Sequence, residues 1–243
     1  YDGVNELLLA DLKIKGAETP VLKKADRNGF FFVANRETGK VISAEKYVFA
    51  NWAKKWDINT MRAEEDPDKR PGPGHPAKDI CPNLIGGKNW QPMSFNPQTG
   101  LVYLPAQNVP VNLTPEKSFA QNAATPGKFG GTTGWNVGFV LNGEPPKAPA
   151  FGKLIAWDPV KQKEAWKVDY VSPWNGGTLT TAGNLVFQGT ADGRFVAYDA
   201  TSGKTLWETP TGTGVSITVD AAGNRVRNAP TLYLLNGAGG AEQ

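Results

Sequence analysis

The feature that most constrains this chain is a repeat with a spacing of about 40 residues. The segments GKLIAWDPVKQKEAW (152–166) and GRFVAYDATSGKTLW (193–207) share an apolar-Ala-aromatic-Asp pattern, a turn and a tryptophan. Their aspartates are 41 residues apart, and so are their tryptophans. A third copy, FFFVANRETGK (30–40), keeps the pattern with Asn35 in the place of the aspartate. Such a period indicates a repeat architecture.

Each copy lies within a run of short predicted strands. In residues 173–210, four runs of alternating apolar and β-branched residues are separated by turns that contain Gly183, Gly193 and Gly203. Four antiparallel strands in a period of about 40 residues are typical of a β-propeller blade. The alternative is a β-sandwich with similar hairpins. We predict an all-β chain that forms a partial β-propeller of about three to four blades.

The strand and turn pattern divides the chain into predicted blades at 3–47, 87–169 and 173–210, a remnant at 211–243, and long excursions at 48–86 and 108–150. Loops of that length in a compact fold are commonly functional. Three blades and a remnant do not close a ring, because propellers have about four to eight blades. We therefore expect that partner chains complete the ring or that these residues are the C-terminal part of a longer propeller.

Composition argues against several classes of protein and site. The net charge is +3 over 243 residues, and no basic stripe with interleaved aromatic residues indicates a nucleic-acid partner. No apolar run predicts a transmembrane segment. A single cysteine, Cys81, excludes an internal disulfide, and a single histidine, His75, argues against a histidine-based metal site. The chain starts without Met or a signal peptide, so we expect a processed product or a fragment.

Unusual side chains stand where three predicted blades begin, near the expected mouth of the propeller channel. They are the pair Asn89-Trp90, the segment Trp174-Asn175-Gly176-Gly177 and the pair Asp2-Gly3. Indole faces beside polar amides suit a flat, polar aromatic ligand that is held by stacking and a few hydrogen bonds. The alternative is that these tryptophans are core residues that fill the channel.

Arg27 is the second candidate for ligand binding. It lies in the sequence Asp26-Arg27-Asn28-Gly29, which predicts a tight hairpin turn. The planar guanidinium of an arginine at a channel mouth can bind carboxylates or quinone oxygens through paired donors. The alternative is a surface arginine at a type I′ turn.

Several long motifs resemble the pyrroloquinoline-quinone-dependent alcohol dehydrogenases, and most closely their quinohaemoprotein ethanol dehydrogenase branch. They are ADRNGFFFV, GGKNWQPMSFNPQTGLVYLPAQNVPVNL, the WDP and KEAW elements, and SPWNGGTLTTAGNLVFQGTADGRFVAYDATSGK. The resemblance covers about residues 1–215. It implies an eight-bladed propeller in the bacterial periplasm, with the quinone and a metal ion on the propeller axis.

The resemblance also implies roles for four residues around the quinone. Arg27 matches the position whose side chain contacts the quinone oxygens. Asn89 and Trp90 match a cofactor-proximal pair, and Trp174 matches an axis residue beside the quinone carboxylates. In the reaction that the resemblance implies, Arg27 stabilises charge that develops on the reduced quinone oxygens.

The remaining parts of the implied site lie at or beyond the ends of the chain. The family's catalytic aspartate belongs to a Trp-Asp-aromatic-x-Gly motif, which would put it immediately before Tyr1, so the chain holds no catalytic residue. Asp2 matches a carboxylate that lanthanide-using relatives add to their metal site, so the metal is expected to be calcium or a lanthanide. The family's other metal ligands belong to earlier blades, and the haem c domain of the quinohaemoprotein branch would follow the propeller.

The implied function is oxidation of small primary alcohols to aldehydes, with a metal as Lewis acid, a carboxylate as base and a cytochrome c-type protein as electron acceptor. The isolated chain is expected to show no turnover, because the base is missing. The alternative from another class is a non-catalytic propeller scaffold or binding module.

Overall fold

The computed structural model describes residues 1–117, 138–140 and 145–212. Within these ranges the regular structure consists of β-strands and one short 3₁₀ helix, η1 (Pro67–Lys69). The prediction of an all-β chain is confirmed. Most of the predicted remnant at 211–243 and the part of the second excursion around Trp135 lie outside the described residues.

Three four-stranded antiparallel sheets form the body of the molecule. Sheet I contains β1 (Leu8–Ile14), β2 (Ala17–Ala25), β3 (Phe30–Asn35) and β4 (Val41–Lys46). Sheet II contains, in spatial order, β8 (Ser94–Asn96), β9 (Leu101–Asn108), β12 (Phe151–Asp158) and β13 (Lys163–Tyr170). Sheet III contains β14 (Thr178–Thr180), β15 (Leu185–Gly189), β16 (Arg194–Asp199) and β17 (Thr205–Pro210).

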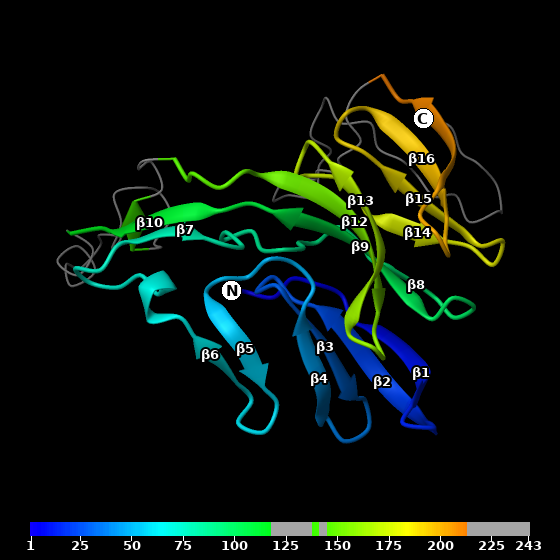
Figure 1. The fold of residues 1–243 in the computed structure, drawn as a ribbon, viewed down its shortest axis with the longest axis horizontal. Coiled ribbons are helices and arrows are strands. Elements are labelled where there is room, and N and C mark those ends of the chain that lie inside the picture. The colour runs from blue at the N-terminus through cyan, green and yellow to red at the C-terminus, as the bar shows by residue number, and fades with distance from the viewer. Residues whose placement is uncertain (118–137, 141–144, 213–243) are drawn as a thin grey trace, which may run out of the picture.

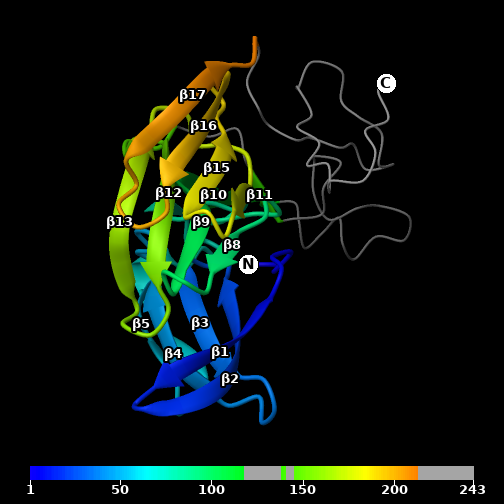
Figure 2. The same ribbon diagram turned by 90° about the vertical axis from the view of Figure 1, so that its right-hand side faces the viewer.

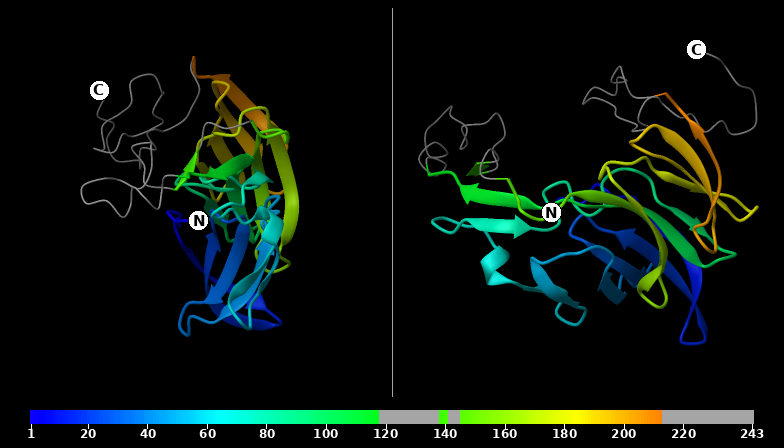
Figure 3. Two further views of the ribbon diagram at one scale, coloured as in Figure 1. Left: turned by 90° about the vertical axis from the view of Figure 1, so that its left-hand side faces the viewer. Right: turned by 45° about the horizontal axis from the view of Figure 1, so that its top comes forward.

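Shorter strands occupy parts of the two predicted excursions. A hairpin of β5 (Ala53–Asp57) and β6 (Arg62–Glu65) follows sheet I. Farther along the chain, β7 (Ala77–Ile80), β10 (Val111–Pro115) and β11 (Phe139–Val140) form a three-stranded sheet in the order β11-β10-β7. These elements flank the three main sheets, which are stacked in the order I, II, III (Figures 1, 2 and 3).

Sheet II is buried on both faces because its side chains alternate between two apolar clusters. All eight residues of β9 are buried. Val102 and Leu104 belong to the cluster shared with sheet I, whereas Leu101 and Tyr103 belong to the cluster shared with sheet III. This alternation is the two-residue period of a strand, and burial of each such aliphatic side chain stabilises the fold by about 1.5–3 kcal/mol.

The repeated Asp or Asn of the sequence pattern closes a turn in each sheet. The Oδ1 atom of Asn35 accepts the backbone N–H groups two and three residues later, at 3.0 and 2.8 Å. Asp158 does the same at 3.0 and 2.9 Å, and Asp199 at 3.0 and 2.8 Å. The repeated residue is therefore a turn former, for which an asparagine and an aspartate are equivalent acceptors.

The first tryptophan of the repeat, Trp166, joins sheet II to sheet III. The indole Nε1 of Trp166, on β13 of sheet II, donates to the carbonyl of Ala200 in the β16–β17 turn of sheet III at 3.1 Å. A Cβ atom added at Gly203 in the same turn would lie 2.5 Å from the Trp166 ring. The glycine of this turn thus makes room for the tryptophan of the neighbouring sheet.

Lys23 is a buried lysine at the contact between sheets I and II. Its side chain is fully buried, and its Nζ atom has no hydrogen-bond partner among the residues that the structure describes. That atom lies 3.0 Å from the centroid of the Phe95 ring. Burial lowers the pKa of Lys23 from 10.5 to about 7, because desolvation disfavours the ammonium form. The face of the Phe95 ring favours the cation and opposes part of this effect.

The lowered pKa of Lys23 predicts that stability rises with pH. Between pH 7 and 10.5 the unfolded state binds more protons at this residue than the folded state, so the free energy of unfolding should rise by about 1 kcal/mol per pH unit. Replacement of Lys23 by Met should remove this slope and stabilise the protein at pH 7. Urea unfolding between pH 7.5 and 9.5 measures both effects. Lys13→Met, on the exposed face of β1, is the matched control and should keep the slope.

Candidate functional site

The predicted site residues come from four segments that precede or connect the inner strands. They are the N-terminal segment 1–6, the β2–β3 turn 26–29, the loop 84–93 before β8 and the loop 171–177 before β14. Hydrogen bonds join the first three segments, and an aromatic contact joins the third to the fourth. The structure therefore brings Asp2, Arg27, Asn89, Trp90 and Trp174 into one region.

Arg27 is held in the β2–β3 turn by backbone carbonyls of two other segments. Its Nη1 atom donates to the carbonyl of Asp2 at 2.9 Å, and its Nη2 atom donates to the carbonyl of Leu84. Its Nε–H group is buried and has no partner among the described residues. An unpaired buried donor of this kind is costly, and it is a group that a bound acceptor would satisfy.

The turn that presents Arg27 differs from a type I′ turn. The N–H of Gly29 donates to the carbonyl of Asp26 at 3.0 Å, and Gly29 has a φ of +93°. Arg27 and Asn28, the central residues, are absent from the described residues with positive φ, whereas a type I′ turn requires positive φ at both. The side chain of Asp26 supports the turn by accepting the N–H of Asn28 at 3.1 Å.

Gly86 and Gly87 allow loop 84–93 to approach the turn closely. Gly86 has a φ of +87°, and a Cβ atom added there would lie 2.5 Å from the Cβ of Arg27. The N–H of Gly87 donates to the carbonyl of Arg27 at 3.0 Å. An added Cβ at Gly87 would lie 2.5 Å from Val48. Only glycine fits between Arg27 and the core at these two positions.

Asn89 orients the backbone that carries Trp90. Its Oδ1 atom accepts the N–H of Trp90 at 2.8 Å, and its Nδ2 atom donates to the carbonyl of Ile85 at 2.7 Å. Asn89 is buried, whereas Trp90 is 36% exposed. The indoles of Trp90 and Trp174 meet edge to face, with ring centroids 6.4 Å apart and an interplanar angle of 65°. They form an aromatic corner with a partly exposed face.

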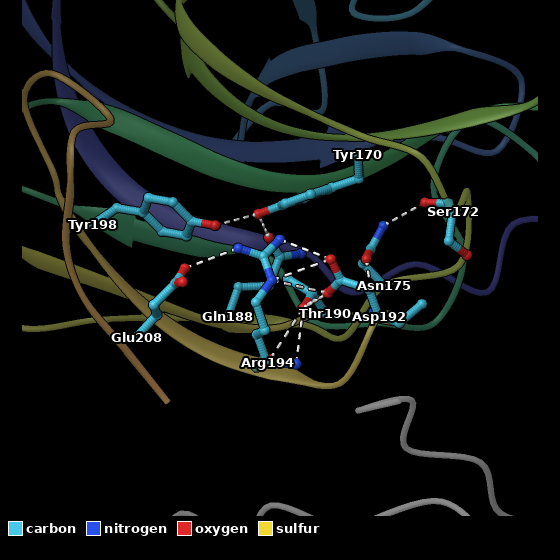
Figure 4. A network of polar contacts seen from close by, with 10 residues as sticks. Tyr170, Ser172, Asn175, Gln188, Thr190, Asp192, Arg194, Tyr198 and Glu208 are labelled. Atoms are coloured by element: carbon cyan, nitrogen blue, oxygen red, sulfur yellow. Dashed lines mark hydrogen bonds and ion pairs between the residues drawn. The ribbon is translucent and has the colours of Figure 1, made fainter. Parts of the chain in front are cut away.

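Hydrogen bonds from sheet III fix the loop that carries Trp174 (Figure 4). Asn175 donates to the carbonyl of Ser172 at 2.8 Å and accepts the N–H of Ala191 at 3.0 Å. Gln188, which is fully buried, donates from Nε2 to the carbonyl of Gly176 at 2.8 Å. The carbonyls of Ser172 and Gly176 each lie two residues from Trp174. The position of Trp174 therefore depends on the side-chain amides of Asn175 and Gln188.

Gln188 is in turn held by a pair of buried tyrosines. The hydroxyl of Tyr170 donates to the Oε1 atom of Gln188 at 2.9 Å and lies 2.8 Å from the hydroxyl of Tyr198. Burial, followed by the effect of Tyr198, raises the pKa of Tyr170, so its proton remains available for this bond. At the outer end of the network in Figure 4, Arg194 pairs with Asp192 and with Glu208.

Tyr1 and the backbone of Asp2 anchor the N-terminal segment, while the carboxylate of Asp2 is exposed. The Tyr1 hydroxyl donates to the carbonyl of Pro82 at 2.6 Å, and the Tyr1 ring lies 5.7 Å from that of Trp52. No group of three or more His, Cys, Asp or Glu side chains in the described ranges could hold a metal ion. The residues in these ranges therefore do not form a complete metal site.

The arrangement fits a flat ligand with acceptor oxygens. The Nε–H of Arg27, unpaired within the described ranges, and the cationic fork of its guanidinium suit carbonyl or carboxylate oxygens. The corner of Trp90 and Trp174 offers apolar ring surface for stacking. A quinone with carboxylate substituents has both acceptor oxygens for Arg27 and a flat ring system for the two indoles.

Two residues that support this region, Glu6 and Lys88, were not predicted from the sequence. Lys88 is fully buried, and its Nζ lies 2.7 Å from the Oε2 atom of Glu6. Lys88 lies inside the family motif GGKNW, and Glu6 lies near the start of the predicted blade 3–47. In the sequence, each is a charged residue among mainly apolar or small neighbours. A charged residue in an exposed loop has the same pattern, so the sequence does not distinguish the two cases.

Comparison with known proteins identifies the family of this fold. The family model described as "PQQ: Glucose/ethanol/alcohol dehydrogenase, beta-propeller domain" matches residues 47–219. The chain belongs to this family. The family resemblance of the motifs and the prediction of a partial quinoprotein β-propeller are confirmed.

Individual relatives agree with this assignment. The chain is 52% identical over 241 residues to a quinohemoprotein alcohol dehydrogenase of Comamonas testosteroni, covering 98% of this chain and 32% of that protein. The crystal structure of that organism's enzyme superposes with a TM-score of 0.80 at 56% identity, covering 88% of this chain and 32% of the other. A lanthanide-dependent methanol dehydrogenase of Methylacidiphilum fumariolicum is 41% identical, covering 88% of this chain and 34% of that protein.

The chain thus spans about a third of the length of the curated relatives it matches. Among the described residues of this PQQ-family chain, no helix is long and apolar enough to cross a membrane.

The close approach of Gly86 to Arg27 predicts an unequal effect of two glycine substitutions. Gly86→Ala should destabilise the protein by more than about 2 kcal/mol, because strain at positive φ adds to a clash with the Arg27 backbone. Gly39→Ala is the matched control, since Gly39 has a φ of +72° with nothing within 4 Å of an added Cβ. Urea unfolding measures both. Equal losses in the two variants would contradict the tight packing of Gly86 on Arg27.

Proposed function

We propose that the protein is a periplasmic quinoprotein that oxidises small primary alcohols to aldehydes, and that this chain forms one wall of its quinone site. The observation that carries the proposal is the buried Nε–H of Arg27, which has no partner within the described part of the chain and lies in the same region as the Trp90–Trp174 corner. The Comamonas relative, whose name states a quinohemoprotein alcohol dehydrogenase, supports the substrate class. A cytochrome c-type electron acceptor and a haem c domain belong to the same proposal.

In this proposal each residue of the chain has a binding role. Arg27 donates to the quinone oxygens, and its cation stabilises negative charge that develops on them. Trp90 and Trp174 exclude water and orient the planar ring system, while Asn89 holds the backbone of Trp90. Pyrroloquinoline quinone, when bound, supplies the two-electron redox chemistry of alcohol oxidation, and the protein contributes orientation and electrostatics.

Arg27 and Trp174 should govern quinone affinity. In the full-length gene product freed of cofactor, Arg27→Lys and Trp174→Ala should each weaken quinone binding by roughly tenfold or more, because the paired donors or the ring surface are lost. Titration followed by quinone absorbance gives the dissociation constants. Arg62→Lys, at an exposed position of β6, is the control and should bind as the unaltered protein does. Unchanged affinity in both site variants would favour the non-catalytic scaffold.

Asp2 is proposed as the residue that adapts the metal site to a lanthanide. An added carboxylate favours a larger ion of higher charge, and the Methylacidiphilum relative is named as lanthanide-dependent.

Replacement of Asp2 by Ala should therefore weaken lanthanum binding relative to calcium binding by roughly tenfold or more. Competition between the two ions in the quinone-loaded, full-length gene product measures the ratio. Asp11→Ala, an exposed carboxylate of β1, is the matched control. An unchanged ratio in Asp2→Ala would rule out Asp2 as a ligand.

A further inference from the structure

An ion pair between a fully buried lysine and a partly buried glutamate lies next to the Asn89–Trp90 segment. The Nζ atom of Lys88, which is fully buried, donates to the Oε2 atom of Glu6 at 2.7 Å and to the carbonyl of Asn89 at 3.1 Å. The second carboxylate oxygen of Glu6 accepts the N–H of Met93 at 2.5 Å. One carboxylate therefore contacts both ends of the 88–93 segment, which carries Asn89 and Trp90.

The neighbouring residue Asn5 extends this set of contacts to the turn that carries Arg27. Its Nδ2 atom donates to the carbonyl of Ala25 at 2.7 Å and to the carbonyl of Lys88 at 3.3 Å. Ala25 ends β2, two residues before Arg27. The dipeptide Asn5-Glu6 thus joins the Arg27 turn to the Asn89–Trp90 segment by side-chain hydrogen bonds alone.

The pair is poorly suited to a purely stabilising role. Burial lowers the pKa of Lys88, and the nearby Glu6 carboxylate opposes that shift. Desolvation of the fully buried Lys88 ammonium offsets part of its attraction to Glu6, and apolar residues of similar volume often stabilise a buried position as well or better. What an apolar pair cannot supply is directional bonding to the Met93 N–H and the Asn89 carbonyl.

We propose that Asn5 and Glu6, acting through Lys88, are positioning residues that fix Asn89 and Trp90 relative to Arg27 at the quinone site. The inference rests on the proposed function, because it assigns these residues a role in cofactor geometry. The hydrogen bonds of the Asn5 and Glu6 side chains go to Ala25, Lys88 and Met93, which lie in or beside the segments that carry the binding groups. Their effect on the ligand is exerted through Asn89, Trp90 and Arg27.

The test measures quinone affinity and thermal stability in the same variants of the full-length gene product, freed of cofactor. Glu6→Gln should weaken quinone binding roughly ten- to a hundredfold, because misplaced site groups lose their alignment. It should also lower the melting temperature, because the Lys88 charge is left buried without its partner. Glu18→Gln, an exposed glutamate of β2, is the matched control and should change neither quantity.

The double variant Glu6→Gln with Lys88→Met separates positioning from stability. It removes the buried charge, so its melting temperature should recover toward that of the unaltered protein, while quinone affinity should stay low. Recovery of affinity together with the melting temperature would show a structural role only and overturn the inference. Full affinity in Glu6→Gln itself would overturn it as well, with the proposed function intact. Absence of quinone binding in the unaltered protein would instead overturn the proposed function, and this inference with it.

Discussion

Burial of sheet II on both of its faces is the constraint on which the rest of the structure depends. Alternate side chains of β9 enter the clusters shared with sheets I and III, so a change of register by one residue would exchange the two faces. Trp166 reinforces this order by docking on the β16–β17 turn of the next sheet. The stacking of sheets thereby fixes where the segments before β8 and β14 lie.

The site follows from that stacking. Loops before the inner strands of sheets II and III carry Trp90 and Trp174, and the side-by-side strands β8 and β14 bring these indoles together. The β2–β3 turn of sheet I supplies Arg27, and two glycines let the loop before β8 approach it. No single blade contains the site. Each blade contributes a loop, and its neighbours set the distances between those loops.

The all-β fold could be predicted from the sequence, because the turn residues are local features that each sheet repeats. The spacing of 41 residues between two of the copies then indicated a repeated unit. Asn35, Asp158 and Asp199 show why this works, since each caps its own turn within three residues. The family of the site was likewise predicted from contiguous motifs such as GGKNW. The Glu6–Lys88 pair could not be found in this way, because its partners are 82 residues apart and meet only after two sheets pack.

In the proposed function, segments from three sheets form one wall of a quinone site. The most direct measurement is an experimental structure of the full-length gene product with pyrroloquinoline quinone bound. We predict a quinone oxygen within hydrogen-bonding distance of the Arg27 guanidinium and the ring system against Trp90 or Trp174. A quinone bound away from Arg27, with the two indoles packed on protein alone, would contradict the account.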